Sequence, residues 1–304
     1  MHDVVIIGSG PAGLTAALYT ARADLHPLVL EGPTPGGQLI RTSFVKNWPG
    51  IPSILGAQLI VNLKEHAQKV GTLFINETAT AITPGTPCTI TTNKQELHAK
   101  TIIIAVGSGA RQLGCPGEQE YWGKGVTICA ICDGTLYRDK PVIIVGGGDT
   151  AMEDAALMSK FTDQITIVHM LDKLTASTTQ QQPVITNPKV TINYQSTISA
   201  ISGDRNHVTH ATIKNVATGQ EKIIPTAAVF LAIGSKPNTD FLRGTLELSS
   251  YGHVKINSNS TVTSQPNIFA CGDAVDYRYR QAITASAGGC MAALDAQHYL
   301  EQQR

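Results

Sequence analysis

The sequence predicts an α/β fold in which two similar units share one chain, the second inserted into the first. A strand–helix–strand pattern with a glycine-rich turn near residue 8 recurs near residue 146. A chain of 304 residues suits about two domains, each large enough to bury its own core. The stretch from residue 267 onward has no partner in the middle of the chain, which favours insertion. We therefore expect two three-layer, Rossmann-like domains, one formed by residues 1–113 and 244–304 and the other by residues 114–243.

Apolar runs and glycine punctuation define the individual elements. Short apolar runs bounded by glycine or polar residues indicate strands, and the segments that follow the glycine-rich turns indicate helices. The expected strands lie at Val4–Ile7, Pro27–Glu31, Lys100–Gly107, Pro141–Val145, Gln164–His169 and Ala227–Gly234, with a further stretch at Asn267–Asp273. The expected helices lie at Pro11–Ala23, Asp149–Phe161 and Gln281–Leu300, and the polar stretch Thr175–Gln182 is expected to be a surface loop or a helix start.

The composition excludes several classes of function. Lys+Arg 23 against Asp+Glu 23 gives no net charge, and no basic run is interleaved with aromatic residues, so binding to nucleic acid or an anionic membrane is not expected. No run approaches the roughly 20 apolar residues that a membrane span needs. Met1, His2 and Asp3 lead straight into the first strand, which leaves no room for a secretory signal, so we expect a reducing, cytoplasmic setting.

The first glycine-rich turn reads Gly8-Ser9-Gly10-Pro11-Ala12-Gly13 and lies between an expected strand and an expected helix. In such a turn the first glycine makes the bend, the second lets the backbone approach a pyrophosphate, and the third lets the helix pack on the strand. The helix N-terminus favours the anion, and Glu31 at the end of the next strand can hydrogen-bond a ribose hydroxyl. These residues predict a dinucleotide site; the alternative is a tight turn in an unrelated α/β fold.

A second turn of this kind reads Gly146-Gly147-Gly148-Asp149-Thr150-Ala151, with alanine in place of the third glycine. A nicotinamide nucleotide normally meets an acidic residue at the end of the second strand, or arginines if it carries a 2′-phosphate. Here His169 is followed by Met170 and Leu171, and no arginine is nearby. We expect nicotinamide binding, and the alternative is a retained scaffold without the ligand. The residues that would bind it are Gly146, Gly148, Asp149, Thr150, Ala151 and His169.

Cys129 and Cys132 are the only two of the six cysteines whose spacing has chemical meaning. Two thiols separated by two residues form a small disulfide ring that can be made and broken repeatedly, and each half-cycle needs a proton that Asp133 can shuttle. In a reducing compartment such a disulfide is usually catalytic. The alternatives are two ordinary core cysteines or half of a zinc site. No second Cys-x-x-Cys or His-x-His completes tetrahedral coordination, so no metal is expected.

Together these features resemble the low-molecular-weight thioredoxin reductases over nearly the whole chain. Residues 8–13 look like that family's FAD pyrophosphate loop, and residues 129–134 are similar to its redox motif. Two further stretches look like its flavin-contacting segments, namely Gly36-Gly37-Gln38-Leu39 and Asn47-Trp48-Pro49-Gly50. The family's closing flavin motif is matched by Gly272-Asp273 followed by Tyr279-Arg280-Gln281-Ala282-Ile283-Thr284.

The resemblance implies a role for each residue. Cys132 would take electrons from the flavin, Cys129 would attack the disulfide of thioredoxin or a similar small redox protein, and Asp133 would be the general acid. The family also implies a homodimer, and a swivel of the inserted domain that alternately offers the flavin to the nicotinamide and the dithiol to the partner. The implied FAD-binding residues are Gly8, Gly10, Pro11, Ala12, Gly13, Glu31, Gly36, Gly37, Gln38, Leu39, Asn47, Gly272, Asp273, Arg280, Gln281 and Ala282.

One departure from the family concerns the electron donor. The family places His-Arg-Arg at the end of the second strand, and another arginine a few residues on, to hold the 2′-phosphate of NADPH. This chain keeps His169 but carries Met170, Leu171 and Thr175 at the other positions. A hydrogen bond to a charged group contributes about 1.5–3 kcal/mol, so the loss of three lowers the preference for NADPH by at least about several hundredfold. The donor is therefore open among NADH, weakly bound NADPH, and a ferredoxin or reduced flavin.

A second function of the same fold runs electrons in the opposite direction. A flavin-dependent dithiol oxidase passes electrons from a small dithiol through the cysteines and flavin to oxygen, and needs no nicotinamide. The missing arginines favour this alternative, whereas Asp133 disfavours it because such oxidases commonly carry histidine after the second cysteine. A non-enzymatic flavin or redox sensor finds no support in the sequence, and the ferredoxin–NADP reductases of similar fold lack the cysteine pair.

Overall fold

The computed structural model describes residues 1–42 and 44–303 of the chain, so Arg304, with which the predicted first domain ends, lies outside them. The chain divides into two compact units, Met1–Gly109 with Lys236–Arg304, and Ala110–Ser235. The boundaries thus fall a few residues before those expected at 113 and 243. The chain leaves and re-enters the first unit through β9 (Ser108–Ala110) and β18 (Ser235–Pro237), which pair with each other.

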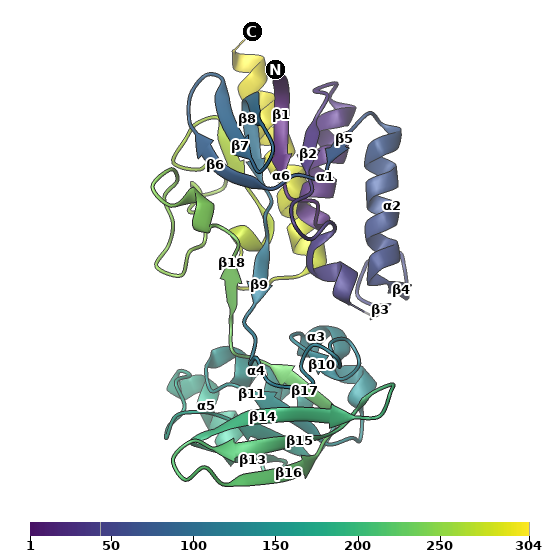
Figure 1. The fold of residues 1–304 in the computed structure, drawn as a ribbon, viewed down its shortest axis with the longest axis vertical. Helices are drawn as coiled ribbons and strands as arrows, with labels where there is room; N and C mark the ends of the chain where they lie inside the picture. The colour runs from purple at the N-terminus through teal and green to yellow at the C-terminus, as the bar shows by residue number, and fades with distance from the viewer. Residues whose placement is uncertain (43, 304) are drawn as a thin grey trace. The chain divides into compact units, whose positions relative to one another are not determined.

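The first unit is built on a seven-stranded sheet with the order β5-β2-β1-β8-β7-β6, in which β19 also pairs with β8 (Figure 1). The strands β5, β2, β1, β8 and β19 run parallel, and β6 and β7 form an antiparallel arm on β8. Parallel strands are covered on both faces and read as continuous apolar runs, as Val4–Ile7 does. The strands are β1 (His2–Ile7), β2 (Leu28–Leu30), β5 (Leu73–Ile75), β6 (Ala79–Thr83), β7 (Cys88–Thr92), β8 (Glu96–Ile104) and β19 (Ile268–Ala270), beside the small hairpin of β3 (Phe44–Val45) and β4 (Ile54–Leu55).

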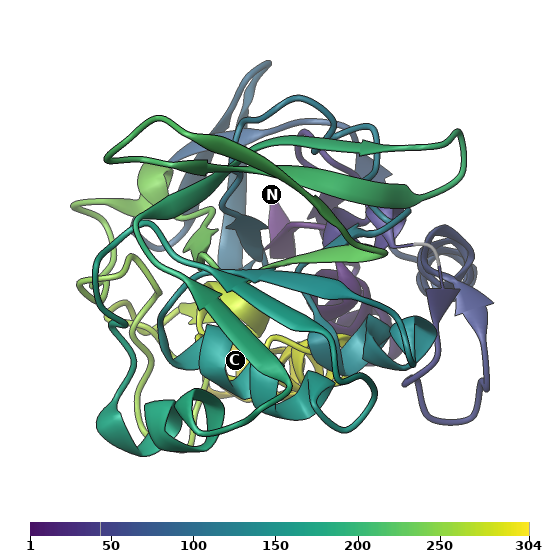
Figure 2. The same cartoon turned by 90° about the horizontal axis from the view of Figure 1, so that it is seen from below.

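The second unit has three layers around a five-stranded parallel sheet of order β10-β17-β11-β12-β13. Short helices pack on one face of this sheet, and an antiparallel sheet of three longer strands, green in Figure 2, packs on the other. The parallel strands are β10 (Val126–Thr127), β11 (Val142–Val145), β12 (Ile165–Val168), β13 (Val190–Asn193) and β17 (Ala228–Leu231). The other elements are α3 (Ala130–Asp133), η2 (Gly134–Tyr137), α4 (Asp149–Met158), α5 (Thr178–Ile185), β14 (Ser196–Gly203), β15 (Val208–Asn215) and β16 (Glu221–Pro225).

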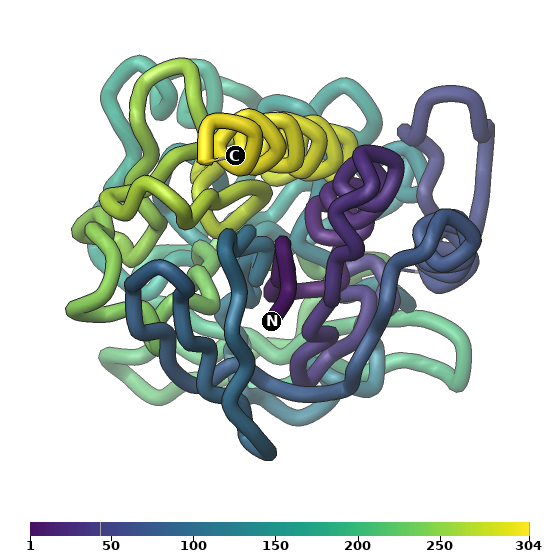
Figure 3. The backbone as a smooth tube through the Cα atoms, turned by 90° about the horizontal axis from the view of Figure 1, so that it is seen from above, coloured from purple at the N-terminus to yellow at the C-terminus, as the bar shows by residue number. Residues whose placement is uncertain are grey.

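Helices from the two ends of the chain cover one face of the first sheet. Figure 3 shows α1 (Pro11–Arg22, purple) beside α6 (Ala282–Gln302, yellow). The two helices approach closely because small residues face the contact: a Cβ added at Gly289 would lie 2.1 Å from the carbonyl oxygen of Ala12. The β6–β7 arm and residues 242–254 cover the other face, so this unit also has three layers. The remaining elements are α2 (Gly56–Lys69), η1 (Gly37–Arg41), η3 (Asp240–Leu242) and η4 (Gly272–Ala274).

The elements expected from the sequence are all present, with ends that differ by a few residues. β8 begins at Glu96 rather than Lys100, because its first residues pair with β7. α4 ends at Met158 rather than Phe161. The polar stretch 175–182 does contain a helix start, since α5 begins at Thr178. Among the described helices, none combines the length and the apolar character that a membrane crossing requires.

Candidate active site

The first glycine-rich turn shows which of its glycines are needed for the fold and which leave room for a ligand. Gly8 has φ +113°, and a Cβ added there would lie 2.3 Å from the carbonyl oxygen of Ala105. A Cβ at Gly13 would lie 1.8 Å from the carbonyl oxygen of Gly8. A Cβ at Gly10, by contrast, meets no described atom within 4 Å, and no described side chain caps α1. Gly10 therefore borders open space at a helix N-terminus, where backbone N–H groups favour an anion.

Ser9 and Glu31 connect this turn to its neighbours. The Ser9 hydroxyl donates to the carbonyl oxygen of Glu31 (3.3 Å) and accepts from the N–H of Gly36 (3.0 Å). Glu31 follows β2, and its carboxylate accepts from Nζ of Lys64 on α2 at 2.6 Å. Lys64 was not anticipated, because the contact joins residues 33 positions apart that no motif relates. The lysine neutralises Glu31 while leaving its second carboxylate oxygen for a ribose hydroxyl.

The two flavin-type segments near residues 36 and 47 close around the same turn. Gly36 and Gly37 have φ of +87° and +66°, a conformation that glycine adopts without strain. Nε2 of Gln38 donates to the carbonyl oxygen of Ser108 at 2.7 Å. Nδ2 of Asn47 donates to Oε1 of Gln281 at 3.2 Å, so segments 234 residues apart meet here. Leu39 lies in η1 between these contacts.

The C-terminal segment completes the arrangement at the start of α1. Gly272 has φ +67°, and a Cβ there would lie 2.9 Å from Cβ of Ala12, so this turn packs directly on the helix N-terminus. Burial, with the Asp276 carboxylate second, raises the pKa of Asp273 to about 6, against the opposing effects of Arg280 and a hydrogen bond from Ser108. A carboxyl group held so unfavourably gains when a ligand hydroxyl hydrogen-bonds to it.

The sixteen sequence-predicted FAD residues thus lie in one unit and converge on the carboxyl ends of β1 and β2. Gln281 begins α6 through a capping box with Thr284, which places Ala282 at the first helical position. Arg280 has φ +48° and its N–H donates to the Asp276 carboxylate at 3.1 Å. The open space at Gly10, the uncapped helix and the buried Asp273 all fit an extended dinucleotide such as FAD.

Cys129 and Cys132 are joined as a disulfide with Cα atoms 5.2 Å apart. Cys129 is the N-cap of α3, and its Sγ accepts from the N–H of Cys132 at 3.2 Å. Both cysteines are partly exposed, and the side chains of Ile128 and Ile131 beside them are 37% and 67% exposed. The residues of the ring are therefore not enclosed in the core of the second unit.

Asp133 is held by a threonine that the sequence reading did not single out. Oγ1 of Thr127 donates to Oδ2 of Asp133 at 2.5 Å and accepts from the N–H of Cys129 at 3.3 Å. The N–H of Asp133 donates to the carbonyl oxygen of Cys129 at 3.1 Å. Thr127 thus fixes the carboxyl group beside the disulfide, and the Thr-x-Cys spacing was the only signal that could have indicated it.

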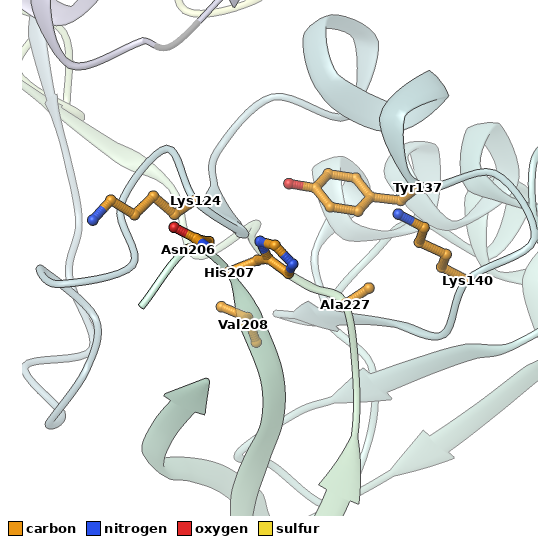
Figure 4. A pocket seen from close by; sticks show the side chains of 7 residues that line it. All are labelled: Lys124, Tyr137, Lys140, Asn206, His207, Val208 and Ala227. Carbon is orange, nitrogen blue, oxygen red and sulfur yellow. The ribbon is translucent and has the colours of Figure 1, made fainter. Parts of the chain in front are cut away.

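A cavity of about 270 Å³ lies near this site in the second unit. Tyr137, which ends η2, points its hydroxyl into it, opposite Asn206 and His207 (Figure 4). Burial, followed by the Asp133 carboxylate, raises the pKa of Tyr137 to about 12, so this phenol stays protonated at neutral pH. Its ring packs edge-on against Phe230 at 5.7 Å, which anchors the segment that follows the redox pair.

The second glycine-rich turn is covered more fully than the first. Gly146 has φ +137°, and a Cβ at the middle residue, Gly147, would lie 2.5 Å from the imidazole of His169. His169 is 7% exposed and its Nε2 donates to the carbonyl oxygen of Lys173 at 3.0 Å. Gly148 is the N-cap of α4, in which Thr150 and the buried Ala151 follow Asp149. The expected nicotinamide residues therefore lie together, with His169 packed on the turn itself.

The segment after β12 folds back onto the same turn. The N–H groups of Thr175 and Ala176 both donate to the carbonyl oxygen of Gly147, at 2.8 and 2.9 Å. The Asp149 carboxylate accepts from the N–H and the hydroxyl of Ser177, at 2.7 and 3.1 Å. Met170 and Leu171, at the positions where a 2′-phosphate would need cations, are 61% and 46% exposed, so these two positions present apolar side chains instead.

Comparison with known proteins decides the family. The family described as pyridine nucleotide-disulphide oxidoreductase matches residues 2–289 of the chain. The chain belongs to this family. A thioredoxin reductase of Streptomyces clavuligerus is 42% identical over 304 residues, covering 99% of this chain and 94% of that protein. The structure of thioredoxin reductase from Streptococcus pyogenes MGAS5005 matches with a TM-score of 0.95 at 38% identity, and that from Giardia duodenalis with 0.94 at 36%, each covering 99% of both chains.

Membership establishes the general chemistry of this pyridine nucleotide-disulphide oxidoreductase. It is a flavoprotein oxidoreductase of the low-molecular-weight thioredoxin reductase class, which works with FAD and a nicotinamide nucleotide. The predicted fold class, two Rossmann-like domains with the second inserted into the first, is confirmed. The relatives span the whole chain, so both units belong to this architecture.

Proposed function

We propose that this oxidoreductase reduces the disulfide of thioredoxin or a similar small redox protein through the Cys129–Cys132 pair. The observation that carries the proposal is the partly exposed disulfide with a carboxyl group fixed beside it by Thr127. The relatives with these lengths and identities are named thioredoxin reductases, which supports the same substrate class. A site of this kind needs an accessible sulfur and a proton source, and Cys129 and Asp133 are proposed to supply them.

Cys129 is suited to be the attacking thiol. Its Sγ accepts the N–H of Cys132, and a hydrogen bond to sulfur favours the thiolate over the thiol. In the reduced protein the Cys129 thiolate attacks one sulfur of the partner disulfide and forms a mixed disulfide. The Cys132 thiolate then attacks Cys129, re-forms the ring and releases the partner as a dithiol. Asp133 donates a proton to the departing sulfur, and Thr127 keeps the carboxyl group in place for it.

The first unit would hold the FAD that returns the ring to its reduced form. The residues proposed to bind it are those at Gly8–Gly13, Glu31, Gly36–Leu39, Asn47, Gly272–Asp273 and Arg280–Ala282. When bound, FAD supplies a two-electron store between the donor and the disulfide. Residues 1–113 with 244–304 are proposed as the FAD-binding domain. Residues 114–243 are proposed as the nicotinamide-type domain that carries the cysteine pair.

The electron donor is proposed to be NADH, weakly bound NADPH, or a non-nicotinamide carrier such as a ferredoxin or reduced flavin. The exposed apolar pair Met170 and Leu171 supports this, because a 2′-phosphate placed against them would lose its water without gaining a cation. The fold-back of residues 175–177 onto Gly147 and Asp149 occupies hydrogen-bonding groups of the turn as well. Ordinary NADPH dependence is therefore not expected.

Anaerobic titration of the purified protein tests both the function and the donor. NADPH, NADH and a chemically reduced carrier are added in separate titrations, and the loss of flavin absorbance is followed before and after addition of oxidised thioredoxin. We expect bleaching by at least one donor and return of the oxidised spectrum with thioredoxin. Cys132→Ser should abolish turnover, while Cys115→Ser, a partly buried thiol of the same unit, should not. A protein that takes up no FAD, or turnover in Cys132→Ser, would refute the proposal.

The dithiol oxidase alternative is kept because it explains the missing arginines without requiring another electron donor. It requires that small dithiols reduce Cys129–Cys132 and that oxygen accept the electrons. Oxygen consumption with a dithiol and no nicotinamide would favour it over the reductase. The carboxyl group of Asp133, held by Thr127 in the position of a proton donor, favours the reductase.

A cytoplasmic homodimer is the proposed form of the protein. The relevant surface in the first unit is an apolar face on α1 and α6, where Tyr19, Ile283, Met291 and Leu294 are each 42–49% exposed. Residues 283, 291 and 294 lie on one side of α6 by helical periodicity. Sedimentation of the wild-type protein should give twice the mass of the chain, and Met291→Glu with Leu294→Glu should give the monomer.

A further inference from the structure

His253 is a buried histidine that none of the motifs accounts for. It is 8% exposed, and its Nε2 is fully buried without a hydrogen-bond partner among the described residues. Nearly all buried polar groups in folded proteins are paired, and leaving one unpaired costs stability. An unpaired nitrogen kept in such a position therefore requires an explanation.

The backbone of His253 is fixed to the flavin-type segment. The N–H of His253 donates to Oγ of Ser249 at 3.1 Å, and the N–H of Ser249 donates back to the carbonyl oxygen of His253 at 2.8 Å. The next residue, Val254, donates its N–H to the carbonyl oxygen of Ala274 in η4 at 2.9 Å. The imidazole is thus held directly beside the turn that carries Gly272 and Asp273.

The side chain faces the loop that joins the two closing flavin segments. The ring of Tyr277 lies edge-on at 6.0 Å, and Asp276 and Arg280 are within electrostatic reach. Burial, with Arg280 second, lowers the pKa of His253 against the opposing effect of Asp276, so the imidazole is neutral at neutral pH. Asp276 in turn accepts the N–H groups of residues 278, 279 and 280, which gives the loop its shape.

We propose that His253 is a positioning residue of the flavin site. Its Nε2 forms a hydrogen bond only when FAD is bound, and this hydrogen bond holds the Asp276–Arg280 loop in place. This loop leads directly into Gln281 and Ala282, so its position sets theirs. The inference rests on the proposed FAD site. It adds to that site a residue that belongs to none of the sequence motifs that predicted the site. It gives a reason for the buried Nε2 of His253, which meets no hydrogen-bond partner among the described residues.

The proposal predicts effects of opposite sign on the apoprotein and on FAD binding, which a merely structural histidine would not give. His253→Phe keeps the ring and its contact with Tyr277 but removes the polar nitrogen. The apoprotein of this variant should unfold at the same temperature as wild type or higher, while its Kd for FAD rises about tenfold, the amount expected for one hydrogen bond. His253→Gln, which keeps a donor, should bind FAD within about twofold of wild type.

The measurement is titration of FAD-free protein with FAD, followed by quenching of FAD fluorescence, together with thermal unfolding of each apoprotein. His298→Phe, the same change at an exposed histidine of α6, is the control and should leave both quantities unchanged. Unchanged FAD affinity in His253→Phe, or a loss of apoprotein stability that Gln does not restore, would overturn the proposal. Failure of the wild-type protein to bind FAD would overturn the proposed function instead, and this inference with it.

Discussion

The missing arginines after β12 can be supplied by two substitutions, Met170→Arg with Leu171→Arg. Both side chains are largely exposed, at 61% and 46%, so arginines can replace them without burying charge. The backbone is fixed there, because the N–H of Gln195 donates to the carbonyl oxygen of Leu171 at 2.9 Å. A charge-assisted hydrogen bond contributes about 1.5–3 kcal/mol, and exposure reduces this to about 1 kcal/mol for each arginine. The gain for a 2′-phosphate is then about 2 kcal/mol, or about thirtyfold in Kd.

The assay is anaerobic titration of wild type and variant with NADPH and with NADH. The Kd for NADPH should fall about thirtyfold in the double-arginine variant, while that for NADH changes little because NADH has no phosphate at this position. Met170→Gln with Leu171→Gln is the matched control, since it removes the apolar surface without adding charge. Equal gains for both nucleotides, or wild-type affinity for NADPH already equal to that of the variant, would show that this segment does not select the donor.

Three further expectations concern single residues of the two sites. Thr127→Val should slow single-turnover reduction of a disulfide partner about ten- to hundredfold, because Asp133 loses the hydrogen bond that fixes its carboxyl group, while Thr127→Ser should stay close to wild type. A normal rate in Thr127→Val would exclude the positioning role. The pKa of Asp273 is raised to about 6 in the folded protein, so its contribution to the free energy of unfolding of the apoprotein is complete below about pH 4. About 3 kcal/mol of this contribution is lost as the pH rises through 6. Chemical denaturation at a series of pH values should show this loss in wild type and not in Asp273→Asn. Gly10→Ala should leave the melting temperature of the apoprotein unchanged and weaken FAD binding. Gly13→Ala should prevent folding, because its Cβ would lie 1.8 Å from a carbonyl oxygen. Wild-type affinity for FAD in Gly10→Ala would contradict the role of Gly10 at the FAD site.

The sequence was sufficient for the elements whose cause is local. Val4–Ile7 is a strand because it is a continuous apolar run, and the glycines at 8 and 13 require their positions because a Cβ would collide with the backbone. The same holds at Gly146 and α4. In such turns the sequence motif follows directly from steric limits on the backbone, so the motif alone predicts the local structure.

Contacts between distant residues could not be obtained in this way. Lys64 meets Glu31 because α2 crosses over the end of β2, and Asn47 meets Gln281 because the chain ends are brought together. His253 lies in a segment with no periodic pattern, and only its burial with an unpaired nitrogen distinguishes it. The three-stranded sheet of the second unit was likewise absent from the expected elements, since its strands alternate apolar and polar residues too irregularly to be recognised.

The pairing of β19 with β8 has a consequence for how the protein is made. One strand of the first sheet, the turn that carries Gly272 and all of α6 lie after residue 267, so the first unit cannot close until these residues have been synthesised. The inserted unit is contiguous and can acquire its structure while synthesis continues. Uptake of FAD must therefore follow the synthesis of these residues, and nascent chains that stop before residue 267 should stay colourless although their inserted unit can already fold.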